Sequence, residues 1–274
     1  MTKKSAGPAR EARQARRQGK ARPARPAGDA MLREAREGLA CALRWAARFG
    51  MSEGVCNHFS VALPGDGERY LINPHGIHWS QMRASDMLLV DGAGTVLAGD
   101  ASLLEATAFF IHSRVHRARA DARCVLHTHM PYATALTSLE GGRLEPVSQN
   151  ALRFVGITAY DEDEGGYRGL ALDAHEGDRM AKALTDKRVL FLANHGVIVV
   201  GPDLATAFDD LYYLERAAQT QVMAAMTGGR LKRVGDNLAR ETFMQMDKLR
   251  SHYAAMHFGA LRRVLDREAP DYRR

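Results

Sequence analysis

The spacing of apolar and polar positions predicts a succession of helices and short strands from residue 29 onward. Leu32, Leu39 and Leu43 recur at helical spacing over residues 29–50, and Asp29 stands where a helix cap is expected. Further helices are predicted over residues 104–119, 131–139, 175–186, 203–226 and 236–265. Strands are predicted over residues 58–63, 69–73, 86–91, 95–99, 122–129, 152–160, 188–193 and 197–201. Because helices alternate with strands, the sequence predicts one α/β domain over residues 29–274 with a mixed sheet.

The composition is typical of a globular chain in a reducing compartment. Of the 274 residues 46% are apolar, which supports a sizeable core, and no apolar run approaches the ~18 residues of a membrane span. A secretory signal is not visible, because its apolar segment is missing. The three cysteines, Cys41, Cys56 and Cys124, are odd in number and far apart, which fits neither a disulfide framework nor a zinc cluster. We expect a cytoplasmic protein that does not enter a membrane.

The net charge of +6 comes from residues 1–28. This segment holds nine lysines and arginines against one acid, Glu11, so it carries +8 and the remaining chain carries −2. It contains no leucine, isoleucine, valine or aromatic residue that could join a core, and we predict a disordered basic tail. Nucleic acid is expected as a partner only through this tail. Its single serine and lack of amphipathic spacing argue against an organelle transit peptide.

Two histidines stand where the predicted strand 122–129 ends. Residues two apart in a strand point to the same face, so His127 and His129 project side by side, as two ligands of one metal would. Taken alone, the pair is equally compatible with ordinary hydrogen-bonded histidines.

A third histidine favours the metal interpretation. His195 stands between two apolar runs, flanked by Asn194 and Gly196. A polar residue at a break in a buried segment costs free energy unless it is bound by another group. Three neutral imidazoles converging on one divalent ion would satisfy it and leave a coordination position open, as in catalytic sites. The sequence therefore predicts a metal site formed by His127, His129 and His195.

These segments resemble the class II aldolase/adducin family. The resemblance rests on "VLHTHMPYATAL", followed some sixty residues later by "LANHGVIVVG", and on "CNHFSVAL", "YLINPHGIHW" and "LLVDGAGTVLAG" in the same order. It extends over about residues 31–227. The two histidine motifs are specific in combination, whereas the glycine-bearing loops alone would be a weak signal.

The resemblance implies a fold, a cofactor and an assembly. It implies an αβα sandwich around a mostly antiparallel mixed sheet, in a homotetramer with active sites between subunits. Family enzymes bind a divalent ion, commonly zinc, through three histidines, which correspond here to His127, His129 and His195. The ion acts as a Lewis acid on a carbonyl and a hydroxyl oxygen and stabilises an enediolate. Imidazole ligands alone also suit manganese and iron.

The family's acid–base residue is replaced here. Sugar-phosphate aldolases of the family carry an acid nineteen residues before the first histidine, and this chain has Ala108 there. Glu105 lies three residues earlier, on the same face of the predicted helix, and is our candidate catalytic residue. The alternative makes Glu105 an ordinary acid at a helix start, stabilised by the helix dipole.

The phosphate loop of the family also departs from its usual pattern. The loop reads "SEGVCNHFS", in which the carboxylate of Glu53 would repel a phosphate dianion, so we expect an unphosphorylated substrate. Gln149 falls near the position of the tyrosine proton donor of sugar-phosphate aldolases, and glutamine cannot perform that acid chemistry. The candidate substrate-binding residues are therefore Asn57, His58, Asn73, His75 and Gln149.

Three functions agree with this sequence. The first is a metal-dependent carbon–carbon lyase, an aldolase or decarboxylase, that acts on a small unphosphorylated hydroxy- or keto-acid. The second is a non-haem iron oxygenase on the same fold, as in a minor branch of the family. The third is a noncatalytic adducin-like module, which the intact histidine triad argues against. We favour the lyase.

Overall fold

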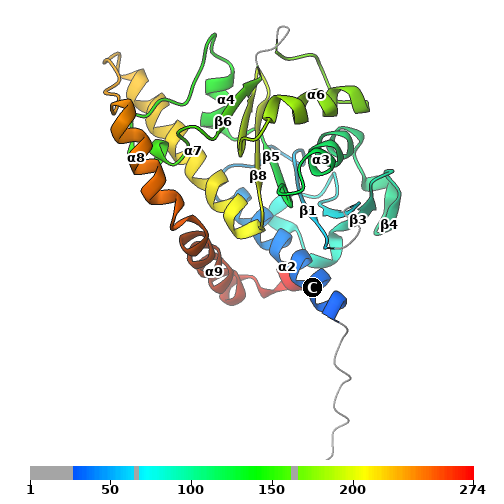
Figure 1. Ribbon diagram of the computed structural model, residues 1–274. Coiled ribbons are helices and arrows are strands. Elements are labelled where there is room, and N and C mark those ends of the chain that lie inside the picture. The colour runs from blue at the N-terminus through cyan, green and yellow to red at the C-terminus, as the bar shows by residue number, and fades with distance from the viewer. Residues whose placement is uncertain (1–26, 65–67, 162–165) are drawn as a thin grey trace, which may run out of the picture.

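An eight-stranded sheet forms the centre of the computed structural model, which describes residues 27–64, 68–161 and 166–274 (Figure 1). The strand order is β4-β3-β2-β1-β5-β8-β7-β6, and every neighbouring pair is antiparallel except β6–β7. The strands are β1 (His58–Ala62), β2 (Arg69–Ile72), β3 (Leu88–Asp91), β4 (Val96–Ala98), β5 (Cys124–Thr128), β6 (Thr158–Asp161), β7 (Val189–Leu192) and β8 (Gly196–Gly201). The predicted mixed, mostly antiparallel sheet is confirmed.

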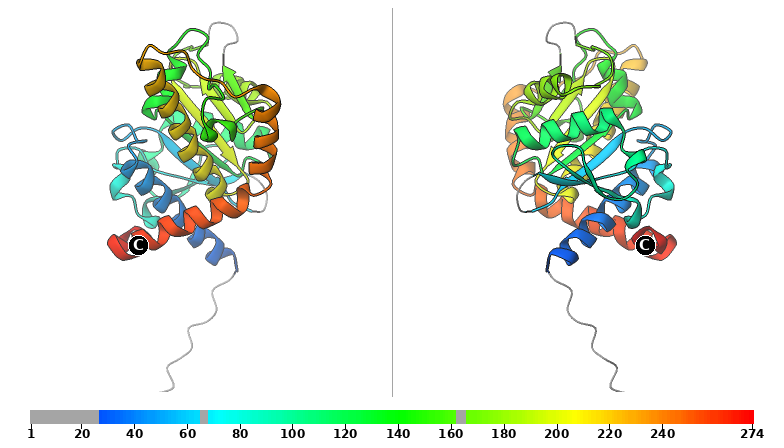
Figure 2. Two further views of the ribbon diagram at one scale, coloured as in Figure 1. Left: turned by 90° about the vertical axis from the view of Figure 1, so that its left-hand side faces the viewer. Right: turned by 90° about the vertical axis from the view of Figure 1, so that its right-hand side faces the viewer.

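Helices cover both faces of this sheet, as the two side views in Figure 2 show. One face carries α3 (Ala106–Ala118) and α6 (Ala174–Leu184), and the other carries α2 (Ala27–Arg48), α7 (Leu204–Met226) and α9 (Arg250–Glu268). The remaining α-helices are α4 (Pro131–Thr137), α5 (Gln149–Leu152) and α8 (Asp236–Asp247). Short 3₁₀ helices span Trp79–Gln81, Ala84–Asp86, Ala101–Leu103 and Pro270–Arg273. The expected αβα sandwich is therefore confirmed.

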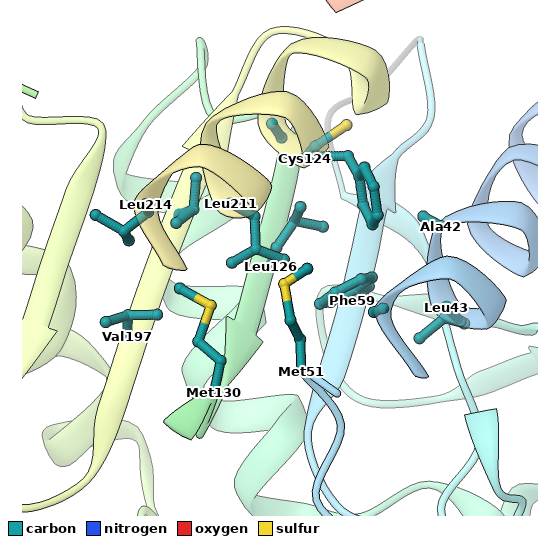
Figure 3. Close-up of a cluster of buried hydrophobic side chains, with 14 of the residues drawn as sticks. Ala42, Leu43, Met51, Phe59, Cys124, Leu126, Met130, Val197, Leu211 and Leu214 are labelled. Carbon is teal, nitrogen blue, oxygen red and sulfur yellow. The ribbon is translucent and has the colours of Figure 1, made fainter. Parts of the chain in front are cut away.

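Alternation along β5 separates two cores and sets the direction of its histidine. Cys124 and Leu126 pack with α2 and α7 in the larger core, whose side chains fill the space between helices and strands in Figure 3. Val125 packs on the opposite face, with Ile111 of α3 and Leu184 of α6. Since side chains two apart share a face, His127 points toward the same face as Val125. The strand thus delivers one imidazole to the α3 side of the sheet.

Two predicted elements were wrong. The apolar run 152–160 is a strand only from Thr158, because α5, capped by the hydroxyl of Ser148, and a turn at Gly156 (φ 79°) precede it. The helix predicted over 236–265 breaks between α8 and α9. After the break, Arg250 pairs with Asp210 of α7, with 2.6 Å between Nη2 and Oδ2.

The basic tail predicted over residues 1–28 lies almost wholly outside the described residues. Its last two residues, from Ala27, belong to the first turn of α2, so the helix starts two residues before the predicted cap. Within the described part of the chain, no helix combines the length and apolar character that crossing a membrane requires. The tail itself stays a prediction.

Candidate metal centre

Three histidines converge where two neighbouring strands meet. His127 lies in β5, His129 directly follows that strand, and His195 lies in the turn between β7 and β8. Strands β5 and β8 pair antiparallel with Thr128 opposite Val197, so the end of β5 lies beside the start of β8. This pairing brings together residues that are 66 or more positions apart in the sequence.

The three imidazoles are close enough for one ion. Their ring centroids are 5.0 Å apart for His127–His129, 4.8 Å for His127–His195 and 4.7 Å for His129–His195. One nitrogen from each ring lies within 4.8 Å of the other two. A tetrahedral ion held at about 2.1 Å by each nitrogen needs them about 3.4 Å apart, so binding would draw the three rings closer together.

A strained turn places the third histidine. Asn194 adopts the left-handed conformation at φ 53°, which asparagine tolerates better than most residues, and its N–H donates to the carbonyl of Thr137 at 3.0 Å. Gly196 follows because a Cβ there would lie 2.5 Å from the carbonyl oxygen of Thr128 and 2.8 Å from Cδ2 of His129. The sequence Asn-His-Gly is therefore what allows His195 to approach the end of β5.

The hydrogen bond of His127 leaves its Nε2 available to bind a metal ion. Nδ1 of His127 lies 3.0 Å from the carbonyl oxygen of Val197, so it carries the hydrogen and Nε2 keeps its lone pair. Burial, together with the neighbouring His195 and His129, holds the pKa of His127 well below 6.5. Nε2 of His129 is also buried and has no hydrogen-bond partner within the described residues. Neutral imidazoles with unused lone pairs are the form that binds a divalent ion.

Glu53 is a site residue whose role the sequence did not indicate. Its carboxylate accepts a short hydrogen bond from Nδ1–H of His129, which directs Nε2 of that ring toward the other two histidines. The sequence offered Glu53 only as a group unfavourable to phosphate. No pattern along the chain indicates this contact, because it depends on the sheet register. His58 pairs with His127, so residues just before β1 lie beside residues just after β5.

Glu105 lies on the α3 side of the sheet, next to His58. Its Oε2 is 3.9 Å from Nδ1 of His58, and its Oε1 accepts the hydroxyl of Thr107 at 2.6 Å. His58 is opposite His127 in the register and is only 4% exposed. Burial lowers the pKa of His58 to about 4, against the opposing effect of Glu105. Glu105 precedes the first residue of α3, but its side chain makes no capping hydrogen bond there.

The other candidate substrate-binding residues are placed differently. Asn57 and Asn73 are buried and join backbone segments: Oδ1 of Asn57 accepts from the N–H of His129 at 3.3 Å, and Oδ1 of Asn73 accepts from the N–H of Phe59 at 2.8 Å. His75 is half-buried and acts electrostatically on His58. These three residues therefore surround the start of β1.

Gln149 and one aromatic residue complete the comparison with the sequence. Gln149 is exposed at the start of α5, which packs against α7 and α8, and its assignment to the site stays a prediction. Tyr167, which the sequence did not single out, has its ring 6.1 Å from the ring of His195 and is 47% exposed. Its position in an irregular segment left no periodic signal.

Comparison with known proteins gives the family. A model of the class II aldolase and adducin N-terminal domain matches residues 37–222. A putative aldolase class 2 protein of Caulobacter vibrioides is 32% identical over 246 residues, which are 87% of this chain and 91% of the relative. The chain belongs to the class II aldolase/adducin family.

A solved structure and a second relative extend this result. The crystal structure of an aldolase II superfamily protein from Pseudomonas syringae superposes with a TM-score of 0.81 at 33% identity, covering 93% of this chain and 98% of that one. A 4-hydroxy-3-prenylphenylpyruvate oxygenase/4-hydroxy-3-prenylbenzoate synthase of Streptomyces roseochromogenus is 32% identical over 191 residues, 69% of this chain and 68% of the relative. The predicted family and fold are confirmed.

Proposed function

We propose that this protein is a divalent-metal-dependent carbon–carbon lyase, an aldolase or decarboxylase, for a small unphosphorylated hydroxy- or keto-acid. The observation that carries the proposal is the convergence of three imidazole nitrogens within 4.8 Å of one another in a family named for its aldolases. His127, His129 and His195 would hold the ion, with zinc first and manganese or iron as alternatives. When bound, the ion supplies Lewis-acid polarisation of the acid's carbonyl and hydroxyl oxygens.

The residues around the triad have separate tasks in this proposal. Glu53 holds His129 in the orientation that presents Nε2, as carboxylates beside metal-binding histidines generally do. Glu105 moves the proton at the reacting carbon or oxygen, with His58 next to its carboxylate at 3.9 Å. Asn57 and Asn73 fix the backbone in front of β1, and His75 lies beside His58.

The charge of the site supports an unphosphorylated substrate. The carboxylates of Glu53 and Glu105 both stand near the triad or the neighbouring His58, where a phosphate dianion would be repelled. A carboxylate and a hydroxyl or keto oxygen on adjacent carbons instead give a monoanion that reaches one ion with two oxygens. This favours small hydroxy- and keto-acids over sugar phosphates.

Elemental analysis of protein purified without a metal-affinity tag tests the proposal. We expect about one divalent ion per chain, and loss of tight binding in each of His127→Ala, His129→Ala and His195→Ala. The control is His252→Ala, which removes an exposed histidine of α9. Stoichiometric metal in all three triad variants would contradict the site. Metal without cleavage of any hydroxy- or keto-acid in a panel would contradict the lyase.

One comparison favours a second candidate, a non-haem iron oxygenase. A relative with 32% identity over 191 residues is named an oxygenase. The two candidates differ in their need for dioxygen, because cleavage by a lyase consumes none. The test is turnover with Fe(II) and with zinc, each with and without oxygen. Oxygen uptake matched to substrate loss, with Fe(II) only, would favour the oxygenase.

We further propose a homotetramer with a small-molecule substrate as its ligand. The apolar residues of α9 fall into two groups. Phe258 and Leu261 pack into the larger core, whereas Tyr253 and Met256 are 53% and 57% exposed. The exposed pair supplies apolar surface for a neighbouring subunit. Light scattering should give four chain masses at micromolar concentration, and a monomer mass would contradict the assembly.

A further inference from the structure

A buried polar chain runs between α3 and β1, beside the metal centre but outside the triad. His112 and His116 lie four residues apart on α3, so both project from one face of the helix toward Ser60 of β1. Oγ of Ser60 is 2.7 Å from Nδ1 of His112 and 2.7 Å from Nε2 of His116. Ser60 and His112 are fully buried, and His116 is 9% exposed. Two imidazoles thus share one hydroxyl in the interior.

The donor and acceptor of each hydrogen bond follow from the group at the end of this series, the carbonyl oxygen of Ala122. Nδ1 of His116 lies 2.7 Å from the carbonyl oxygen of Ala122, which can only accept, so Nδ1 carries the hydrogen. Burial lowers the pKa of His116 to about 4, so its ring is neutral at pH 7 and Nε2 is an acceptor. The single hydrogen of Ser60 therefore goes to His116, and Ser60 must accept Nδ1–H of His112.

This order fixes the remaining nitrogen of His112 as a bare acceptor. Burial holds the pKa of His112 well below 6.5, so the neutral ring has one N–H. That N–H is on Nδ1 and donates to Oγ of Ser60. Nε2 of His112 is buried and has no hydrogen-bond partner within the described residues. An unsatisfied acceptor in the interior costs free energy, and it indicates a donor nearby.

His58 is the neighbouring group that can donate. The ring centroids of His58 and His112 are 6.3 Å apart with the planes at 83°, and Nε2 of His58 is also buried without a partner in the described structure. His127 also interacts electrostatically with His112, but it cannot donate to it, because its single N–H donates to the carbonyl oxygen of Val197. The other titratable groups that act on His58 are Glu105 and His75.

We propose that His112 is a positioning residue of the metal centre, whose Nε2 accepts the Nε2–H of His58 directly or through one water. His58 then keeps its lone pair on Nδ1, the nitrogen that lies 3.9 Å from the carboxylate of Glu105. A proton that reaches this pair has one place to be held, between Oε2 of Glu105 and Nδ1 of His58. This catalytic consequence rests on the proposed lyase function, whereas the tautomer of His58 does not.

Long-range ¹H–¹⁵N spectra of the full chain with ¹⁵N-labelled histidine test the tautomers, because the two nitrogens of a neutral imidazole have distinct shifts. The spectra are recorded without metal and with zinc. We expect hydrogen on Nδ1 of His112 and His116, and on Nε2 of His58. Hydrogen on Nδ1 of His58 in both forms would overturn the proposal. The wild-type spectrum decides this point without any variant.

Variants test the link between His112 and His58. His112→Asn keeps a donor near Ser60 but removes the Nε2 acceptor, so His58 should lose its single tautomer. Ser60→Ala is the second variant, since without the hydroxyl His112 is free to change tautomer. The matched control is Ser113→Ala, which removes a buried hydroxyl of the same helix that has no hydrogen bond to Ser60. An unchanged His58 signal in both test variants would overturn the link.

Kinetics separate positioning from a purely structural role. We expect His112→Asn to lower kcat by about 10- to 100-fold, the scale on which outer hydrogen-bond partners act. KM and metal content should be unchanged, because His58 is not a metal ligand. His112→Gln, whose amide approaches the Nε2 position, should restore part of that loss. Wild-type kcat in a folded His112→Asn would overturn the positioning role. The assigned tautomers in a protein that cleaves no acid would instead contradict only the lyase.

Discussion

Nδ1 of His129 donates a hydrogen bond to the carboxylate of Glu53, a residue 76 positions earlier in the chain. The contact follows from the pairing of β1 with β5, which sets His58 opposite His127 and so places the segment before β1 beside the segment after β5. A carboxylate behind an imidazole fixes the tautomer and raises the basicity of the ligating nitrogen. Glu53 is therefore expected to determine metal affinity without contacting the ion.

Glu53→Gln should weaken binding of the ion by about 10- to 100-fold, the usual range for such partners. The amide oxygen still accepts a hydrogen bond, so the fold and the position of His129 are retained, but the negative charge is lost. Competition with a chelating dye measures the affinity. Glu140→Gln, at an exposed residue after α4, is the control and should bind as the wild type does. Equal affinity in the two variants would show that Glu53 has no such role.

Gly196→Ala should disrupt the metal centre by a steric route. The added Cβ would lie 2.5 Å from the carbonyl oxygen of Thr128 and 2.8 Å from Cδ2 of His129, so the backbone or that ring must move. We expect weaker metal binding and a loss of about 1–3 kcal/mol in the free energy of unfolding, the usual cost of overpacking. Calorimetry of binding and urea titration measure the two effects.

The control for this substitution is Gly235→Ala. Gly235 has no atom within 4 Å of an added Cβ and is not in the left-handed region, so the methyl group meets open space. Its metal affinity should match that of the wild type. A Gly196→Ala protein with unchanged affinity would show that β8 and the end of β5 can separate at little cost.

The three histidines were predictable because each stands in a local pattern. The pair at 127 and 129 follows a strand whose alternation is visible, and His195 interrupts two apolar runs. That the two motifs meet was inferred from the chemistry that three imidazoles can share, and the family resemblance implied the same set. The pairing of β5 with β8 that brings the motifs together has no signal in local spacing. The helices and most strands followed from periodicity for the same reason.

Contacts that depend on sheet register or on a turn were not predictable. Glu53 meets His129 only because β1 pairs with β5 in one register, and no spacing along the chain records that register. The apolar run 152–160 looks like a strand, yet Gly156 turns the chain and only its last residues pair with β7. In both cases a long-range pairing decides the outcome.

Acid should destabilise the metal-free protein at a pH above the range in which carboxylates titrate. Burial lowers the pKa of His58 and of His116 to about 4 in the folded chain, whereas an unfolded histidine titrates near 6.5. Between these values the unfolded state binds more protons, so the free energy of unfolding is highest above pH 6.5 and falls as the pH decreases toward 4. Each such histidine contributes up to about 1.4 kcal/mol per pH unit.

Urea unfolding in the presence of a chelator, from pH 7.5 to pH 5, measures this slope. His116→Asn should reduce the slope by about one histidine's contribution, because the ring that resists protonation is gone. His252→Gln, at an exposed histidine, should leave it unchanged. A free energy of unfolding that stays constant over this range would contradict the assignment of buried neutral histidines.

Glu105→Gln decides whether the acid next to His58 performs the chemistry. Its carboxylate lies 3.9 Å from Nδ1 of His58 and accepts a hydrogen bond from the hydroxyl of Thr107. Both contacts fit a residue that moves a proton beside the triad. The competing role is that of an acid at the start of α3, stabilised by the helix dipole; the Glu105 side chain makes no capping hydrogen bond there.

The expected result for Glu105→Gln is a retained fold, retained metal and turnover reduced by about 100-fold or more, the usual scale for a lost acid–base group. Glu241→Gln, at an exposed acid of α8, is the control and should keep full turnover. Metal content is measured beside the rate in the same preparation, because the two readings together separate three roles. Loss of the ion would make Glu105 a ligand rather than an acid–base residue. Full turnover with the ion retained would leave the described residues without an assigned proton carrier, and would favour the oxygenase, for which dioxygen is the reactant.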